Sequence, residues 1–130
     1  MELKAKILVV DDEPINIKLL EAILAPEYVV LTALSGQDAL KIIDEQDVDV
    51  VLLDIMMPGM HGLEVTKRLR AEPNHSNIPI ILITSLKRTE DRIKGQEVGA
   101  DDYIAKPFDK NEVLARIKIL LKRGHSSGQS

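Results

Sequence analysis

In the stretch Val50–Gly62, VVLLDIMMPGMHG, an unbroken apolar segment is followed directly by a single carboxylate, that of Asp54. The four residues before Asp54 do not alternate with polar residues, so they predict a strand that is covered on both faces, as in a parallel sheet. Pro58 and Gly59 then indicate a turn, after which helical spacing resumes. Asp54 therefore stands where a buried strand meets a loop, which is where open α/β sheets bind ligands. Taken alone, an acid facing water would be the simpler interpretation.

The same order of apolar segment, polar turn and helical spacing recurs along the chain. Strands are predicted at 7–10, 27–32, 50–53, 79–83 and 102–105, each followed by a helix. Strict alternation indicates an α/β fold, a doubly wound five-stranded parallel sheet with right-handed crossovers and helices on both faces. Residues 1–123 are expected to form one domain; Gly124 should end the last helix, leaving 124–130 as a flexible tail or linker stub.

Composition narrows the functional classes. Hydrophobic residues make up 45% and aromatic residues 2%, so aliphatic side chains must fill the core. A net charge of -4 gives no general attraction to nucleic acid or to anionic membranes, and no partner of either kind is expected. The chain has no cysteine and no signal-like or membrane-spanning segment. A cytoplasmic location is expected.

Three consecutive acids, Asp11, Asp12 and Glu13, follow the first predicted strand. One of them could favour the start of the next helix, where Pro14 suits the first turn. Three adjacent carboxylates repel one another unless a cation is near, which favours a metal site. From this loop alone, the helix start and the metal site are about equally supported.

The remaining polar candidates also follow strands. Thr84 comes after the fourth strand and Lys106 after the fifth, so both should gather with the acids at one edge of the sheet. Separately, Thr84 could be a helix cap and Lys106 an ordinary loop residue. Together the set suits phosphoryl transfer to Asp54: an acidic pair holds Mg2+ while Lys106 and Thr84 contact phosphoryl oxygens.

Four segments carry a resemblance to a known family: VVDDE, LLDIMMPGMHG, ITS and GADDYIAKPF. Up to about Arg123 the chain resembles the receiver domain of a bacterial two-component response regulator. The resemblance implies a flavodoxin-like sheet with strand order 2-1-3-4-5, Asp54 as phosphoacceptor, and a cis Lys106–Pro107 bond. It also implies a Mg2+ site made by Asp11, Asp12, Asp54 and the Met56 carbonyl. Thr84 and Lys106 would respond to the phosphate, and Tyr103 falls on the family's switch aromatic position.

The implied function is a phosphorylation-dependent signalling switch that catalyses only its own phosphorylation and dephosphorylation. Its implied partners are a sensor histidine kinase or phosphotransfer protein, a second copy of the chain when phosphorylated, and an output domain in a longer parent chain. The expected dimer face carries the charged residues Arg92, Asp101, Asp102, Glu112, Arg116 and Arg123.

Two smaller expectations concern single side chains. Met56 and Leu86 occupy the positions two past the acceptor and two past Thr84, where the family orients hydrolytic water; neither hydrogen-bonds water usefully, which predicts slow self-dephosphorylation. The histidines lack a metal-ligand pattern and are expected at the surface, at His61, His75 and His125.

Three other functions compete with the switch. A phosphatase of the haloacid dehalogenase type needs a second acid two residues after its nucleophile, where this chain has Met56. A flavodoxin-like nucleotide or flavin binder needs a first loop that accepts phosphate, which three acids would repel. A pseudo-receiver that serves only as a docking module stays open.

Overall fold

The computed structural model describes residues 4–85 and 89–129, with the backbone alone for 89–92 and 124–129. Five strands and five helices alternate along these residues, as the sequence predicts. The strands are β1 (Lys6–Val10), β2 (Val29–Ala33), β3 (Val50–Asp54), β4 (Ile80–Thr84) and β5 (Asp102–Ala105). The helices are α1 (Pro14–Leu24), α2 (Gly36–Glu45), α3 (Gly62–Ala71), α4 (Thr89–Val98) and α5 (Lys110–Gln129).

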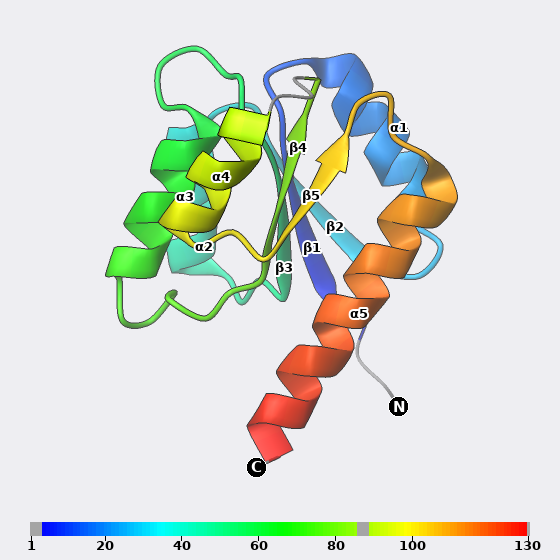
Figure 1. Cartoon of the computed structure of the whole chain (residues 1–130). Helices are drawn as coiled ribbons and strands as arrows, with labels where there is room; N and C mark the ends of the chain where they lie inside the picture. Colours follow the sequence, from blue (N-terminus) through cyan, green and yellow to red (C-terminus); the bar gives the residue numbers. More distant parts are fainter. Residues whose placement is uncertain (1–3, 86–88, 130) are drawn as a thin grey trace.

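The strands form one parallel sheet in the order β2-β1-β3-β4-β5, which confirms the expected topology. Helices α1 and α5 cover one face, and α2, α3 and α4 cover the other (Figure 1). Covering both faces explains why every residue of β3 and β4 is buried and why their sequences show no polar alternation.

The core is therefore divided into two layers by the sheet. Ile81 and Ile83 of β4 belong to the cluster that also holds α1 and α5 side chains such as Leu20 and Ile117. Ile80 and Leu82 belong to the cluster on the α2 and α3 side. Each fully buried aliphatic side chain contributes roughly 1.5–3 kcal/mol relative to an exposed one, so this packing holds the loops at the end of the sheet in place.

Two helices begin with a side-chain cap. The Ser35 hydroxyl accepts a hydrogen bond from the Asp38 N–H at 3.1 Å, at the start of α2. The Asp109 carboxylate accepts one from the Glu112 N–H at 3.1 Å, at the start of α5. Gly99 follows α4 with a φ of 96°, the left-handed conformation of a helix stop.

The end of α5 differs from expectation, because the helix continues past Gly124 to Gln129. A glycine stops a helix when it adopts the left-handed conformation, and among the described residues only Gly59 and Gly99 have a positive φ. In a right-handed conformation Gly124 merely lowers helix stability, by about 1 kcal/mol relative to alanine. Across the described residues, no helix has the length and apolar character needed to span a bilayer.

Candidate functional site

The register of the sheet places the predicted acids next to each other. Val10 at the end of β1 pairs with Leu53 of β3, so the next residues, Asp11 and Asp54, emerge side by side. Both carboxylates are enclosed, with Asp11 2% and Asp54 5% exposed. Among the described residues, Asp11, Asp12 and Asp54 each offer a carboxylate oxygen within 4.8 Å of the others. Three clustered hard oxygen donors fit a cation such as Mg2+.

Lys106, which follows β5 on the other side of β4, places its ammonium group next to these carboxylates. Its Nζ lies 3.3 Å from Oδ2 of Asp11 and 3.3 Å from Oδ2 of Asp54. Its own N–H donates to the carbonyl of Thr84 at 2.8 Å, which fixes the start of the loop after β5. The Lys106–Pro107 bond is cis, as the resemblance implies.

The charges of this cluster are coupled. The pKa of Asp54 is raised to about 6, chiefly by burial and also by the neighbouring charge of Asp11, against the opposing effects of Lys106 and of the Met56 N–H. Burial acts to lower the pKa of Lys106, but the charges of Asp54 and Asp11 outweigh burial and leave that pKa raised. One ammonium group thus faces two enclosed carboxylates, so the site has unbalanced negative charge that a bound cation would offset.

The loop after β3 packs tightly against the end of that strand. The Met56 N–H points to Oδ1 of Asp54 at 3.4 Å, and the Gly62 N–H donates to the Ile55 carbonyl at 2.9 Å. A Cβ on Gly62 would overlap the carbonyl oxygen of Asp54 and lie 2.8 Å from the Cα of Ile55. The absence of a side chain at Gly62 is therefore what lets α3 begin directly beside Asp54.

Thr84 and Tyr103 lie on one face of the sheet. Thr84 is 3% exposed and pairs in register with Ala105, two residues past Tyr103. Side chains two apart along a strand share a face, so Tyr103 is a diagonal neighbour of Thr84. Tyr103 is partly buried against the core on the α2 and α3 side. The structure brings the predicted pair together, and its coupled movement stays a prediction.

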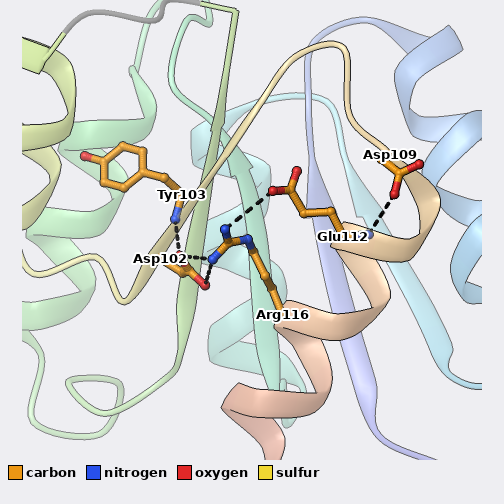
Figure 2. A network of polar contacts seen from close by, with 5 residues as sticks. All are labelled: Asp102, Tyr103, Asp109, Glu112 and Arg116. Carbon is orange, nitrogen blue, oxygen red and sulfur yellow. Dashed lines mark hydrogen bonds and ion pairs between the residues drawn. The ribbon is translucent and has the colours of Figure 1, made fainter.

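The charges of the predicted dimer face have partners within the chain. Nη1 of Arg116 contacts both carboxylate oxygens of Asp102 at 2.8 Å, and Nη2 reaches Glu112 at 3.4 Å (Figure 2). Asp101 instead pairs with Arg70 at 2.8 Å. Arg123 is exposed on α5. The side chain of Arg92, and Leu86 as a whole, lie outside the described residues.

Arg70 has a structural role that its sequence context does not indicate. Its guanidinium donates to the carbonyls of Gly99 and Ile78 and to the carboxylate of Asp101, each at 2.8 Å. These bonds tie the end of α3 to the segments before β4 and β5. Nothing in the sequence distinguishes Arg70 from Arg68, which pairs with Glu64 at the surface.

The histidines are more enclosed than expected. Nε2 of His75 lies 2.9 Å from Asp44, and the His75 side chain is 18% exposed. His61 is half-buried, and its Nδ1 has no partner within the described part of the chain. The side chain of His125 is not described.

Comparisons with known proteins agree on the class of this chain. The family described as "Response regulator receiver domain" matches residues 7–118. A protein of Guillardia theta named "Probable transcriptional regulator ycf27" is 44% identical over 131 residues, which is 100% of this chain and 50% of that protein. This chain spans half or less of the length of curated relatives that it matches.

Solved structures share the fold. A putative response regulator from Chloroflexus aurantiacus is 35% identical with a TM-score of 0.88, covering 92% of this chain and 98% of that one. A structure described as the BeF3-activated DrrB receiver domain is 38% identical with a TM-score of 0.83, covering 92% of this chain and 99% of that one.

Proposed function

Because the chain belongs to the family of response regulator receiver domains, we propose that it is a phosphorylation-dependent signalling switch whose acceptor is Asp54. The observation that carries the proposal is the position of Lys106, 3.3 Å from the carboxylates of both Asp54 and Asp11. A phosphoryl group on Asp54 would meet this ammonium group without rearrangement of the strands.

The reaction is a transfer between two nucleophiles. An oxygen of Asp54 forms a bond to phosphorus while the bond from phosphorus to a donor nitrogen or oxygen breaks, and the electron pair of that bond leaves with the donor. Lys106 stays beside the transferred group and pairs with one of its oxygens. Thr84, buried at the end of β4, offers a hydroxyl on the adjacent strand. The resulting shift of Thr84 and Tyr103 selects between two conformations of the domain.

Asp11, Asp12 and Asp54 fit Mg2+, with the Met56 carbonyl as a further ligand. When bound, the cation would offset the charge of the carboxylates and of the incoming phosphoryl oxygens. Asp12 is half-buried at the outer side of the cluster, while Asp11 is fully enclosed. The chain itself thus supplies the ligands, the nucleophile and one fixed positive charge.

The donor is proposed to be a sensor histidine kinase or a phosphotransfer protein. Asp54 is 5% exposed, so a donor must dock around the edge of the sheet to reach it. Helix α1 starts two residues after Asp12 and carries Ile15 and Leu19, which are 66% and 52% exposed. These side chains give a docking protein apolar area beside the acceptor.

The output is proposed to be a change in a surface formed by α4, β5 and α5, through which phosphorylated copies dimerise. Ile93 on α4 and Ile119 on α5 are 49% and 55% exposed. Arg116 and Glu112 lie on α5 one turn apart, within reach of a partner that competes for their internal pairs. An output domain in a longer parent chain is part of the proposal, supported by the greater length of the relatives.

The test of the central reaction needs no partner. The protein is incubated with a small acyl phosphate and Mg2+, and its intact mass is measured. We expect one phosphoryl adduct on the wild type, none on Asp54→Asn, and none when a chelator removes Mg2+. If neither protein gains an adduct, the chain is the docking pseudo-receiver instead. Steady release of phosphate from other phosphate esters would indicate the dehalogenase-type phosphatase.

A further inference from the structure

Tyr103 and Gly95 form a contact between β5 and α4 that the motifs do not predict. The ring of Tyr103 points away from Arg116 and toward the side of the sheet that carries α4 (Figure 2). A Cβ built on Gly95 would overlap the phenolic oxygen of Tyr103 and the ring carbon that bears it. The same Cβ would come within 2.9 Å of Cδ1 of Leu82, the residue that pairs with Tyr103 in the sheet. The ring therefore fits only because residue 95 has no side chain.

Gly95 is not needed for the backbone of α4. It lies inside the helix, and among the described glycines only Gly59 and Gly99 adopt a positive φ. A glycine at such a position costs about 1 kcal/mol of helix stability relative to alanine. The glycine is locally unfavourable, and the ring packed against it is the feature of the fold that requires it.

This contact is also how α4 meets the sheet. Of positions 93–98 on α4, Gly95 alone is buried, whereas Ile93 is 49% exposed. Within positions 93–98 the helix has little other buried surface, so the placement of this part of α4 depends on what fills the space beneath Gly95. Tyr103 fills it. The position of the ring and the position of α4 are therefore linked.

We propose that Gly95 is the positioning residue for Tyr103: the gap that it leaves in α4 admits the phenol ring and makes α4 respond to where that ring lies. The effect of this contact on signalling rests on the proposed switch. Thr84 lies diagonal to Tyr103 on the same face, so a change at Asp54 reaches α4 through Thr84, the ring and this gap. A side chain at position 95 turns the ring outward and disconnects α4 from the acceptor.

Two tyrosines and no tryptophan make the ring observable. The full chain is labelled with 3-fluorotyrosine, and the two 19F resonances are assigned with Tyr103→Phe. In Gly95→Ala we expect the Tyr103 resonance to move toward that of free fluorotyrosine and to gain a larger solvent isotope shift. The Tyr28 resonance, from the far side of the sheet, should not move. Gln96→Ala, at an exposed position of α4, is the matched control and should leave both resonances in place.

A double-mutant cycle separates this role from general helix stability. In the wild-type background Gly95→Ala should lower the urea midpoint, because the new methyl group collides with the ring. In the Tyr103→Ala background the same change should raise the midpoint, because only the better helix propensity of alanine remains. If Gly95→Ala is too poorly folded to give a midpoint, its loss of folding set against a raised midpoint in the Tyr103→Ala background shows the same reversal of sign. A change of equal sign in both backgrounds would overturn the proposal.

Phosphorylation distinguishes this inference from the proposed function. Gly95→Ala should still gain the phosphoryl adduct on Asp54, since residue 95 contributes no group to the acidic cluster. The Tyr103 resonance should respond to the adduct in the wild type and should not respond in Gly95→Ala. If the wild type gains no adduct, the proposed switch is refuted. The role of Gly95 in placing the ring is then decided by the 19F resonances and the double-mutant cycle of the unmodified protein. An adduct in both proteins with equal Tyr103 responses refutes the role of Gly95 alone.

Discussion

Asp54 ends β3 and Lys106 directly follows β5, two strands that are separated by β4, yet their charged groups lie 3.3 Å apart across the end of the sheet. The same ammonium group is 3.3 Å from Asp11. One cation thus faces two enclosed anions; burial, with the nearby Asp11, raises the pKa of Asp54 to about 6 even though Lys106 acts to lower it. Several measurable properties depend on this imbalance.

Replacing Asp54 with asparagine should stabilise the metal-free protein near neutral pH. The folded-state pKa of Asp54 is raised from 3.8 to about 6, so the folded state binds this proton more tightly than the unfolded state does. The resulting stabilisation of the wild type is complete below about pH 4 and is lost as the pH rises through about 6. The unfolding free energy of Asp54→Asn minus that of the wild type should grow over this window to on the order of 1–3 kcal/mol. Urea unfolding of both proteins at several pH values measures it, and a difference that is flat with pH would contradict the raised pKa.

Mg2+ should stabilise the wild type through the three carboxylates. We expect Asp12→Asn to weaken Mg2+ affinity roughly tenfold or more, equivalent to about 1.4 kcal/mol. Glu13→Gln is the matched control, because Glu13 is an exposed neighbouring acid outside the cluster and loses the same charge. Calorimetric titration with Mg2+ compares the two. Equal losses in both variants would indicate a diffuse electrostatic effect and no built site.

Gly62→Ala should destabilise the fold directly beside Asp54. The added Cβ overlaps the carbonyl oxygen of Asp54, and that backbone is held inside the sheet, so we expect a loss of about 1–3 kcal/mol. Glu64→Ala, in the same turn of α3 but exposed, should cost less than about 0.5 kcal/mol. Denaturant unfolding compares the two variants. A neutral Gly62→Ala would show that the loop can shift away from the acceptor.

Arg116→Glu should prevent dimerisation of the activated protein. The change places a third carboxylate beside Asp102 and Glu112, so it removes the cation from the proposed face and adds repulsion. Lys118→Glu changes the charge of α5 equally, at an exposed residue 3.8 Å from Glu27 and away from that face. Sedimentation at low salt with a phosphoryl mimic should show dimers for the wild type and Lys118→Glu and monomers for Arg116→Glu. Since the contacts are partly ionic, salt should weaken the dimer. A wild type that stays monomeric under these conditions would show that this surface is not a dimer interface.

The acyl phosphate should be long-lived, because the exposed Met56 side chain beside Asp54 cannot orient a water molecule. Met56→Asn should shorten its lifetime, and adding a polar residue at position 86, which lies outside the described residues, should shorten it further. The intact-mass adduct followed over time gives the decay rate. Equal decay in the wild type and the doubly polar variant would refute this explanation.

The sequence alone specified much of this protein. Unbroken apolar segments such as Val50–Leu53 specify strands covered on both faces, and caps such as Ser35 and Asp109 are local signals that depend on neighbours three residues away. Polar residues directly after parallel strands must meet at one edge, so Asp11, Asp54 and Lys106 could be grouped before any distance was known.

Only the tertiary structure decided what depends on contacts between distant segments. The bonds of Arg70 to Gly99 and Asp101 join residues about thirty positions apart, and the exclusion of a Cβ at Gly95 depends on where β5 places a ring beneath α4. A glycine in a helix and an arginine near its end have the same local pattern whether or not they make such contacts. Side-chain packing across elements is set by the assembled fold and not by local periodicity, so these two positions became informative only once the helices were in place.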